Sequence, residues 1–310
     1  MNRRQQVFLL GLALLVALIA GATYMFMAPA QITGKIQLVA SFYPLAYFSE
    51  EIGGDKVEVR TLIPYNTEVH SWQPSTADIM ALADADIVVY NGADLDQWFQ
   101  EDILPALNIS GKIVVEAAAN LTLITASGDT DEPGPYDPHT WISPHLAEGE
   151  ALSIYNALVQ KDPANAAYYN QRWQSLKERL EGLDASYTSG LANKTRGTIF
   201  VTHAAFGYLA YRYNFTQEGV IGISADQEPS AEGIAALVEQ MVEHNTFFVF
   251  VDPVYSDQYA LILKNELEAR TGHQVQILEL SLILGPLSGE DYIAQSEANL
   301  NNLKIGLGVP

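Results

Sequence analysis

Short apolar runs alternate with helical patterns along this chain, and one long amphipathic stretch interrupts the alternation near the middle. In this stretch, residues 163–191, apolar side chains recur every three or four positions, which is the spacing of one helix face. Four strands with interleaved helices precede the stretch, and four follow it. Strands separated by helices pair in parallel, with helices on both faces of the sheet. The sequence therefore predicts an α/β protein of two lobes, each with a parallel four-stranded sheet, joined by one long helix.

The predicted elements have definite bounds. We expect strands over residues 35–42, 56–63, 86–90, 112–117, 197–202, 218–223, 247–252 and 274–280. We expect helices over residues 44–52, 74–83, 95–107, 144–161, 163–191, 205–213, 230–244, 255–271 and 291–307. The apolar stripe of the long helix consists of Tyr169, Trp173, Leu176, Leu180, Leu183, Tyr187 and Leu191.

The length of 310 residues suggests two folded units behind an amino-terminal export segment. Residues 7–30 carry no charge and follow Arg3 and Arg4, a pattern that directs the rest of the chain outward across a membrane. Ala28-Pro29-Ala30 also resembles a cleavage site, so the segment is interpreted as either an anchor or a removed signal. We expect an extracytoplasmic protein, membrane-anchored or secreted. Its predicted parts are the export segment 1–30, one lobe over 31–161, the connecting helix over 162–192 and a second lobe over 193–310.

The charge balance and the absence of cysteine exclude several classes of function. The formal net charge is -21, from 37 acidic and 16 basic residues. Nucleic-acid binding needs a basic surface, so a nucleic-acid partner is excluded. The chain has no cysteine, which excludes disulfides, thiolate metal sites and attachment of a lipid through cysteine. Any metal site must use nitrogen and oxygen ligands.

Candidate metal ligands follow predicted strands in both lobes. His70 lies in the loop after the second strand, and His139 lies in the loop after the fourth. His203 ends the fifth strand, and Glu279 ends the eighth. Open α/β sheets bind ligands at the carboxyl ends of their strands, so these side chains can converge in a cleft between facing lobes. Glu68 and Glu228 are alternatives to Glu279 as the carboxylate.

His139 has the most specialised surroundings of the four. Pro138 and Pro144 fix the backbone on either side of it. Asp137 is near enough in sequence to orient the imidazole, and Trp141 can exclude water. These are the surroundings that a metal-ligating histidine requires.

Three imidazoles and one carboxylate suit a borderline divalent ion, with Zn²⁺ first and Mn²⁺ next. The same ligand set also builds catalytic zinc sites, so a metal-dependent hydrolase is the alternative, and a surface interaction module with a structural metal is a third possibility. A single histidine in a loop is more often a surface or capping residue, and the hypothesis depends on three of them falling at strand ends. The remaining histidines, His145, His244 and His273, are not assigned to the site.

Three segments carry a family resemblance. Residues 68–75 (EVHSWQPS), 137–144 (DPHTWISP) and 203–210 (HAAFGYLA) resemble the signature regions of the zinc- and manganese-binding solute receptors of ABC importers. The resemblance covers nearly all of the exported part. It implies two α/β lobes held by a rigid long helix, a metal in the cleft between them, little hinge movement, and delivery of the metal to a membrane permease by a monomeric receptor that is not an enzyme.

The resemblance also implies ligand roles for His70, His139, His203 and Glu279, where the family commonly has aspartate in place of the glutamate. Two features depart from the family pattern. The loop at residues 127–135 is short, acidic and without histidine, and no cysteine is present to receive a lipid. Manganese-preferring relatives tend to have glutamate at the third histidine, so His203 favours zinc.

Overall fold

Two parallel sheets form the centres of two lobes. The computed structural model describes residues 34–125, 136–222 and 229–310. The first sheet contains β1 (Ile36–Ala40), β2 (Val57–Thr61), β3 (Ile87–Tyr90) and β4 (Ile113–Glu116), in the order β2-β1-β3-β4. The second contains β5 (Thr198–His203), β6 (Thr216–Ile221), β7 (Phe248–Val251) and β8 (Gln276–Glu279), in the order β6-β5-β7-β8. Every pairing is parallel, so the two lobes repeat one topology and the predicted fold class is confirmed.

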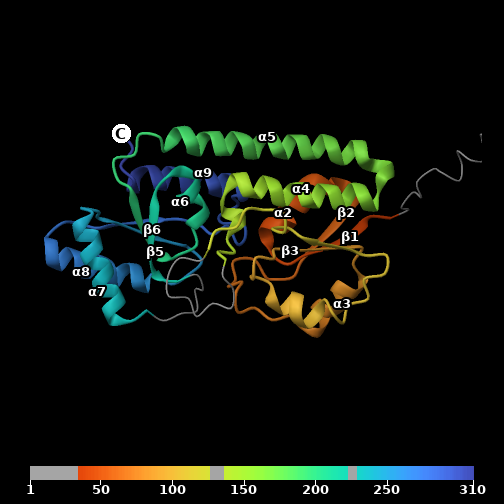
Figure 1. Ribbon diagram of the computed structural model, residues 1–310, viewed down its shortest axis with the longest axis horizontal. Coiled ribbons are helices and arrows are strands. Elements are labelled where there is room, and N and C mark those ends of the chain that lie inside the picture. The colour runs from red at the N-terminus through yellow and green to blue at the C-terminus, as the bar shows by residue number, and fades with distance from the viewer. Residues whose placement is uncertain (1–33, 126–135, 223–228) are drawn as a thin grey trace, which may run out of the picture.

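Helices cover both faces of each sheet (Figure 1). They are α2 (Tyr43–Gly53), α3 (Thr76–Asp84), α4 (Pro144–Lys161), α5 (Ala166–Gly190), α6 (Gly207–Tyr213), α7 (Ala231–Glu243), α8 (Gln258–Thr271) and α9 (Tyr292–Gly306). Short 3-10 turns stand at Gly54–Lys56, Thr140–Ile142 and Pro163–Asn165. The start of α3 has a reciprocal cap, because Ser75 accepts from the Asp78 N–H while the Asp78 carboxylate accepts from the Ser75 N–H.

The long helix α5 lies over both lobes. Figure 1 shows it along the upper edge of the molecule, with α4 beneath it on one side and α9 on the other. It packs against α2 and α4 of the first lobe and against α9 of the second. The whole predicted stripe is buried, namely Tyr169, Trp173, Leu176, Leu180, Leu183, Tyr187 and Leu191. Burial of each large side chain contributes roughly 1.5–3 kcal/mol, so this face is a major attachment of the helix to both lobes.

One hydrophobic core runs through the two lobes without interruption. It contains Leu38 and Phe48 from the first lobe, Leu180 from α5, and Ile199 and Leu303 from the second lobe. Two smaller clusters lie on the outer faces, one between the first sheet and α3 and one between the second sheet and the pair α7 and α8. The lobes are therefore packed on a common core and not merely tethered.

The helix predicted over residues 95–107 is wrong in its length and type. The structure has a π-helical turn, Trp98–Ile103, in which the Leu104 N–H donates to the Phe99 carbonyl at 2.8 Å. Pro105 ends it, since proline has no N–H to continue the ladder. Because the π-helix is rare and short, a sequence with ordinary helical periodicity gives no sign of it.

The expected anchor at residues 1–30 lies outside the described residues. Within residues 34–125, 136–222 and 229–310, no helix combines the length and the apolar character needed to cross a bilayer.

Candidate metal centre

Three histidines meet where the lobes face one another. His70, His139 and His203 each offer a ring nitrogen within 4.8 Å of the others. The Nε2 atoms of His70 and His139 are 3.2 Å apart. Zn–N bonds of about 2.0–2.1 Å place two imidazole nitrogens of a tetrahedral site about 3.3 Å apart. The pair from the first lobe therefore already has the separation of two zinc ligands, and His203 brings a third imidazole from the second lobe.

The His139 loop, residues 137–143, leads directly into α4. The Asp137 carboxylate accepts from the His139 backbone N–H at 2.9 Å and lies 2.8 Å from Nδ1 of the same residue. Because a carboxylate only accepts, Nδ1 carries the proton, and Nε2 keeps its lone pair toward His70. Trp141 is fully buried with its ring 5.3 Å from the His139 ring, so the predicted roles of both neighbours agree with the geometry.

Both lobes hold this loop in place. From the first lobe, the Asn91 side chain donates to the Pro138 carbonyl at 3.0 Å. From the second lobe, the Tyr292 hydroxyl donates to the Trp141 carbonyl at 2.5 Å. The Trp141 indole in turn donates to the Leu282 carbonyl at 2.8 Å. The ligand loop is thus bonded across the lobe interface, although it belongs in sequence to the first lobe.

Burial keeps His70 in its metal-binding protonation state. The pKa of His70 lies well below its usual value, mainly because burial disfavours the charged form and also because His139 and His203 would repel it. Neutral imidazole is the form that binds a metal. His139 and His203 are buried, at 1% and 4% exposed, whereas His70 is only partly buried.

The candidate carboxylates in the described residues are not part of the three-histidine group. Glu279 ends β8 as predicted, but its side chain is exposed and is not part of the three-histidine group. Its carbonyl accepts from the Asn302 side chain at 2.8 Å. Glu68 accepts from the His70 backbone N–H at 2.8 Å through Oε1, while Oε2 is buried with no hydrogen-bond partner in the described part of the chain. Glu228 lies outside the described residues.

Asp252, at the end of β7, is a buried carboxylate that the sequence did not single out. Burial raises its pKa to about 6, against hydrogen bonds from the N–H groups of Leu282 and Val254. The charges of Glu68 and Glu279 add to the rise. Three carboxylates near enough to repel one another make this part of the cleft favourable for a cation. The sequence signal that could have identified Asp252 is its position directly after a buried strand.

The other histidines lie apart from the cluster. His145 is exposed in the first turn of α4, His244 is the carboxyl-terminal cap of α7, and His273 is exposed beyond the end of α8. None of the three belongs to the group of three histidines in the described part of the chain.

Two α/β lobes on one long helix, with imidazoles from both lobes converging between them, define a metal-binding solute-binding protein. Comparison with known families agrees. The profile of the ZnuA family, described as zinc-uptake complex component A, periplasmic, matches residues 38–306. The chain belongs to this family. It is therefore an extracytoplasmic transport component of a metal import system and not an enzyme, and the alternative of a metal-dependent hydrolase is not supported.

Named relatives are similar over most of this chain. The high-affinity zinc uptake system protein ZnuA of Bacillus subtilis is 33% identical over 289 residues, covering 88% of each chain. The zinc-binding lipoprotein AdcA of Streptococcus pneumoniae is 30% identical over 283 residues, covering 88% of this chain. This chain spans only 56% of the length of AdcA.

Solved structures show the same architecture. The laminin-binding protein Lmb of Streptococcus agalactiae, described as having adhesin and metal transporting activity, has a TM-score of 0.78 and 30% identity over 88% of this chain and 99% of its own. The Zn(II)-bound ZnuA-like domain of Streptococcus pneumoniae AdcA has a TM-score of 0.75 and 29% identity over the same shares. TroA of Treponema pallidum, at 23% identity and a TM-score of 0.79, shows the likeness of the fold alone.

Proposed function

We propose that this protein captures Zn²⁺ outside the cytoplasm with His70, His139 and His203 and delivers it to the permease of an ABC importer. The observation that carries the proposal is the meeting of three imidazole nitrogens within 4.8 Å, contributed by both lobes. Nitrogen-rich sites favour zinc over manganese in affinity, which supports Zn²⁺ as the first cargo and Mn²⁺ as the second.

We assign the fourth ligand position to a carboxylate. The contacts favour Glu68. Its Oε2 is buried without a partner in the described part of the chain, and its Oε1 accepts from the backbone N–H of the proposed ligand His70. Glu279 is the competing candidate, and its exposed side chain has to turn inward to reach the ion. In either case one negative charge offsets half the charge of the cation.

The transport partner and the attachment extend the same proposal. A zinc-uptake component must pass its cargo to a membrane permease, and the zinc-uptake relative from Bacillus subtilis supports this role. We assign attachment to residues 1–30, with their uncharged stretch behind Arg3 and Arg4. The receptor acts as a monomer, with lobes over residues 31–161 and 193–310 and the connecting helix over 162–192.

Metal titration of single variants tests the ligand set. Wild type is expected to bind one Zn²⁺ per chain by calorimetry and to melt at a higher temperature with zinc. His139→Ala and His203→Ala are expected to lose most of this affinity, and His145→Ala, which changes an exposed histidine outside the cluster, serves as the control. Equal zinc affinity in all four proteins would overturn the proposal.

A second comparison decides the carboxylate. Glu68→Gln and Glu279→Gln each remove one candidate charge with little change in volume. If Glu68 is the fourth ligand, only Glu68→Gln weakens zinc binding. A loss confined to Glu279→Gln assigns the position to Glu279 instead, and no loss in either variant shows that neither carboxylate is a ligand.

A further inference from the structure

A tyrosine from the second lobe bonds to two paired chain segments beside the His139 loop. Residues 124–125 and 136–137 run antiparallel, with a bridge between Thr125 and Tyr136. The Asp137 N–H donates to the Ile124 carbonyl at 3.0 Å. The Tyr208 hydroxyl contacts the backbone of both residues of this pair.

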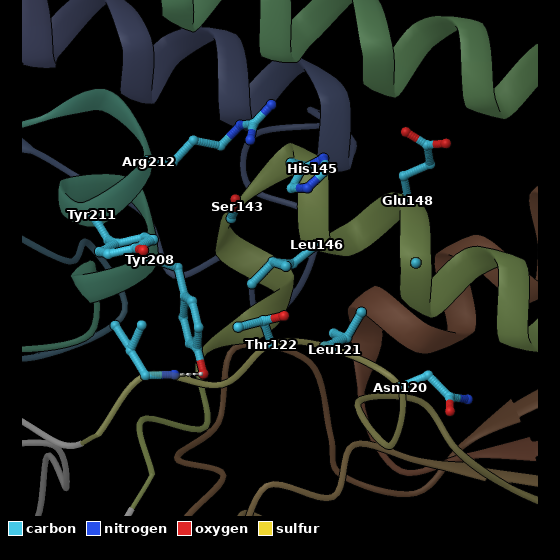
Figure 2. Close-up of a pocket in the computed structure, with 12 residues that line it drawn as sticks. Asn120, Leu121, Thr122, Ser143, His145, Leu146, Glu148, Tyr208, Tyr211 and Arg212 are labelled. Carbon is cyan, nitrogen blue, oxygen red and sulfur yellow. Dashed lines mark hydrogen bonds between the residues drawn. The ribbon is translucent and has the colours of Figure 1, made fainter.

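The Tyr208 hydroxyl makes one hydrogen bond to each of the two chain segments. It donates to the Asp137 carbonyl at 2.6 Å and accepts from the Ile124 N–H at 3.4 Å. Figure 2 shows the Tyr208 side chain reaching down from α6, with the dashed bond at its hydroxyl. The backbone of Asp137 is therefore fixed by a side chain of the second lobe.

The residue before this tyrosine approaches the Asp137 carboxylate. A Cβ added to Gly207 would lie 2.4 Å from Asp137 Oδ2, so a larger residue there would displace this carboxylate. The other oxygen, Oδ1, is the one that accepts from the backbone of His139 and faces its Nδ1. Gly207 and Tyr208 thus border the carboxylate and the carbonyl of the residue that orients a metal ligand.

Tyr208 is buried beside a cavity. It lines a cavity of about 840 Å³ between α4 and α6, together with Leu121, Leu146 and Tyr211 (Figure 2). The residue itself is only 3% exposed, so its hydroxyl bonds are shielded from water. Loss of the hydroxyl would leave buried backbone groups without this partner, which costs free energy.

We propose that Tyr208 is a positioning residue for the metal ligand His139, acting through Asp137. The proposal rests on the zinc-binding function proposed above. Through this contact α6 is connected to two of the three histidines. It begins shortly after His203 in the chain, and its Tyr208 orients His139 across the lobe interface. The hydroxyl contributes to affinity by holding the Asp137–His139 pair in its binding geometry before zinc arrives.

Tyr213 provides a matched control on the same helix. It is buried like Tyr208, and its hydroxyl donates to the Asp184 carboxylate at 2.7 Å, away from the histidine cluster. Tyr208→Phe and Tyr213→Phe each delete one buried hydroxyl that makes a short hydrogen bond. A purely structural role predicts the same behaviour for both variants.

The experiment measures zinc affinity by competition with a chelator, for the full chain and both variants. Because loss of an outer contact to a metal ligand typically weakens affinity 10–100-fold, Tyr208→Phe is expected to bind zinc roughly tenfold more weakly, with Tyr213→Phe within about twofold of wild type. In imidazole ¹⁵N NMR spectra of the zinc-loaded protein, the His139 Nδ1–H signal shifts in Tyr208→Phe and not in Tyr213→Phe.

Equal zinc affinity in the two variants, with an unshifted His139 signal, would overturn the positioning role and leave the zinc function standing. Failure of wild type to bind zinc, or unchanged binding in His139→Ala, removes the zinc function itself. If Tyr208→Phe does not fold, Gly207→Ala decides, since its methyl group displaces the Asp137 carboxylate directly. A Gly207→Ala protein with the affinity of wild type refutes the role.

Discussion

Glu150, a buried glutamate on α4, should make the metal-free protein lose stability as the pH rises. Its side chain is fully buried, and Oε1 accepts from the Thr140 hydroxyl at 2.5 Å. Oε2 has no hydrogen-bond partner in the described part of the chain. Burial raises the pKa of Glu150 to about 8, with the Thr140 bond opposing the rise. Replacement by glutamine keeps the shape and removes the titration.

The direction and the size of this change in the unfolding free energy follow from linkage between protonation and folding. Below the unfolded pKa of 4.5, both states hold the proton and nothing is lost. As the pH rises toward about 8, the unfolded chain releases the proton while the native state retains it, so stability falls. At 1.36 kcal/mol per pKa unit, the loss between about pH 5 and about pH 7 is about 2–3 kcal/mol. Tyr208 and Tyr292, the nearby ionisable groups, have pKa values raised by burial and stay neutral in this window.

Urea denaturation of metal-free wild type and Glu150→Gln, across this pH range, measures the effect. The stability of wild type relative to the variant should fall by about 2–3 kcal/mol from about pH 5 to about pH 7. Other titrating groups cancel in this difference because both proteins contain them. Glu178→Gln, on the exposed face of α5, should show no such change relative to wild type. Parallel curves for wild type and Glu150→Gln would refute the burial argument.

Further predictions concern the site and the core. Asp137→Ala should weaken zinc binding about 10–100-fold, because His139 loses the acceptor that fixes its tautomer; an affinity equal to that of wild type in a chelator competition would contradict this. Zinc affinity should be nearly constant around about pH 7 and fall only at lower pH, because burial lowers the pKa of His70 and keeps its imidazole neutral; calorimetry over a pH series measures this, and an affinity that already falls between about pH 8 and about pH 7 would argue against it. Leu180→Ala should lower the unfolding free energy by about 2–5 kcal/mol in a single transition, and a second transition that spares one lobe would show that the core is not shared.

The fold was largely predictable because its signals are strong and repeated. Each of the eight apolar runs became a strand, and the stripe on residues 163–191 became the buried face of α5. Residues 144–161 gave the bounds of α4 without error, since Pro144 at the first turn fixes the start. The π-helical turn at Trp98–Ile103 was missed because its extra residue per turn leaves no periodic mark.

The site was predictable only as far as residues follow strands. The three histidines were found because parallel strands bring their carboxyl ends to one edge. The contacts of Tyr208 were not predictable, since its hydroxyl bonds to two backbone segments that lie far from it in the sequence. Glu279 lies at the end of β8 as predicted. Position along a strand does not determine where a long flexible side chain points, and this one is exposed.

The uninterrupted core beneath α5 has a consequence for unloading. A receptor whose lobes were joined only by a flexible linker would open by thermal motion and release its metal into the solvent. Here, a wider separation of the lobes would expose packed apolar side chains such as Leu180 and Leu303 to water. Spontaneous opening of the lobes therefore costs free energy. We therefore expect the metal to leave through small local rearrangements and not through a wide separation of the lobes.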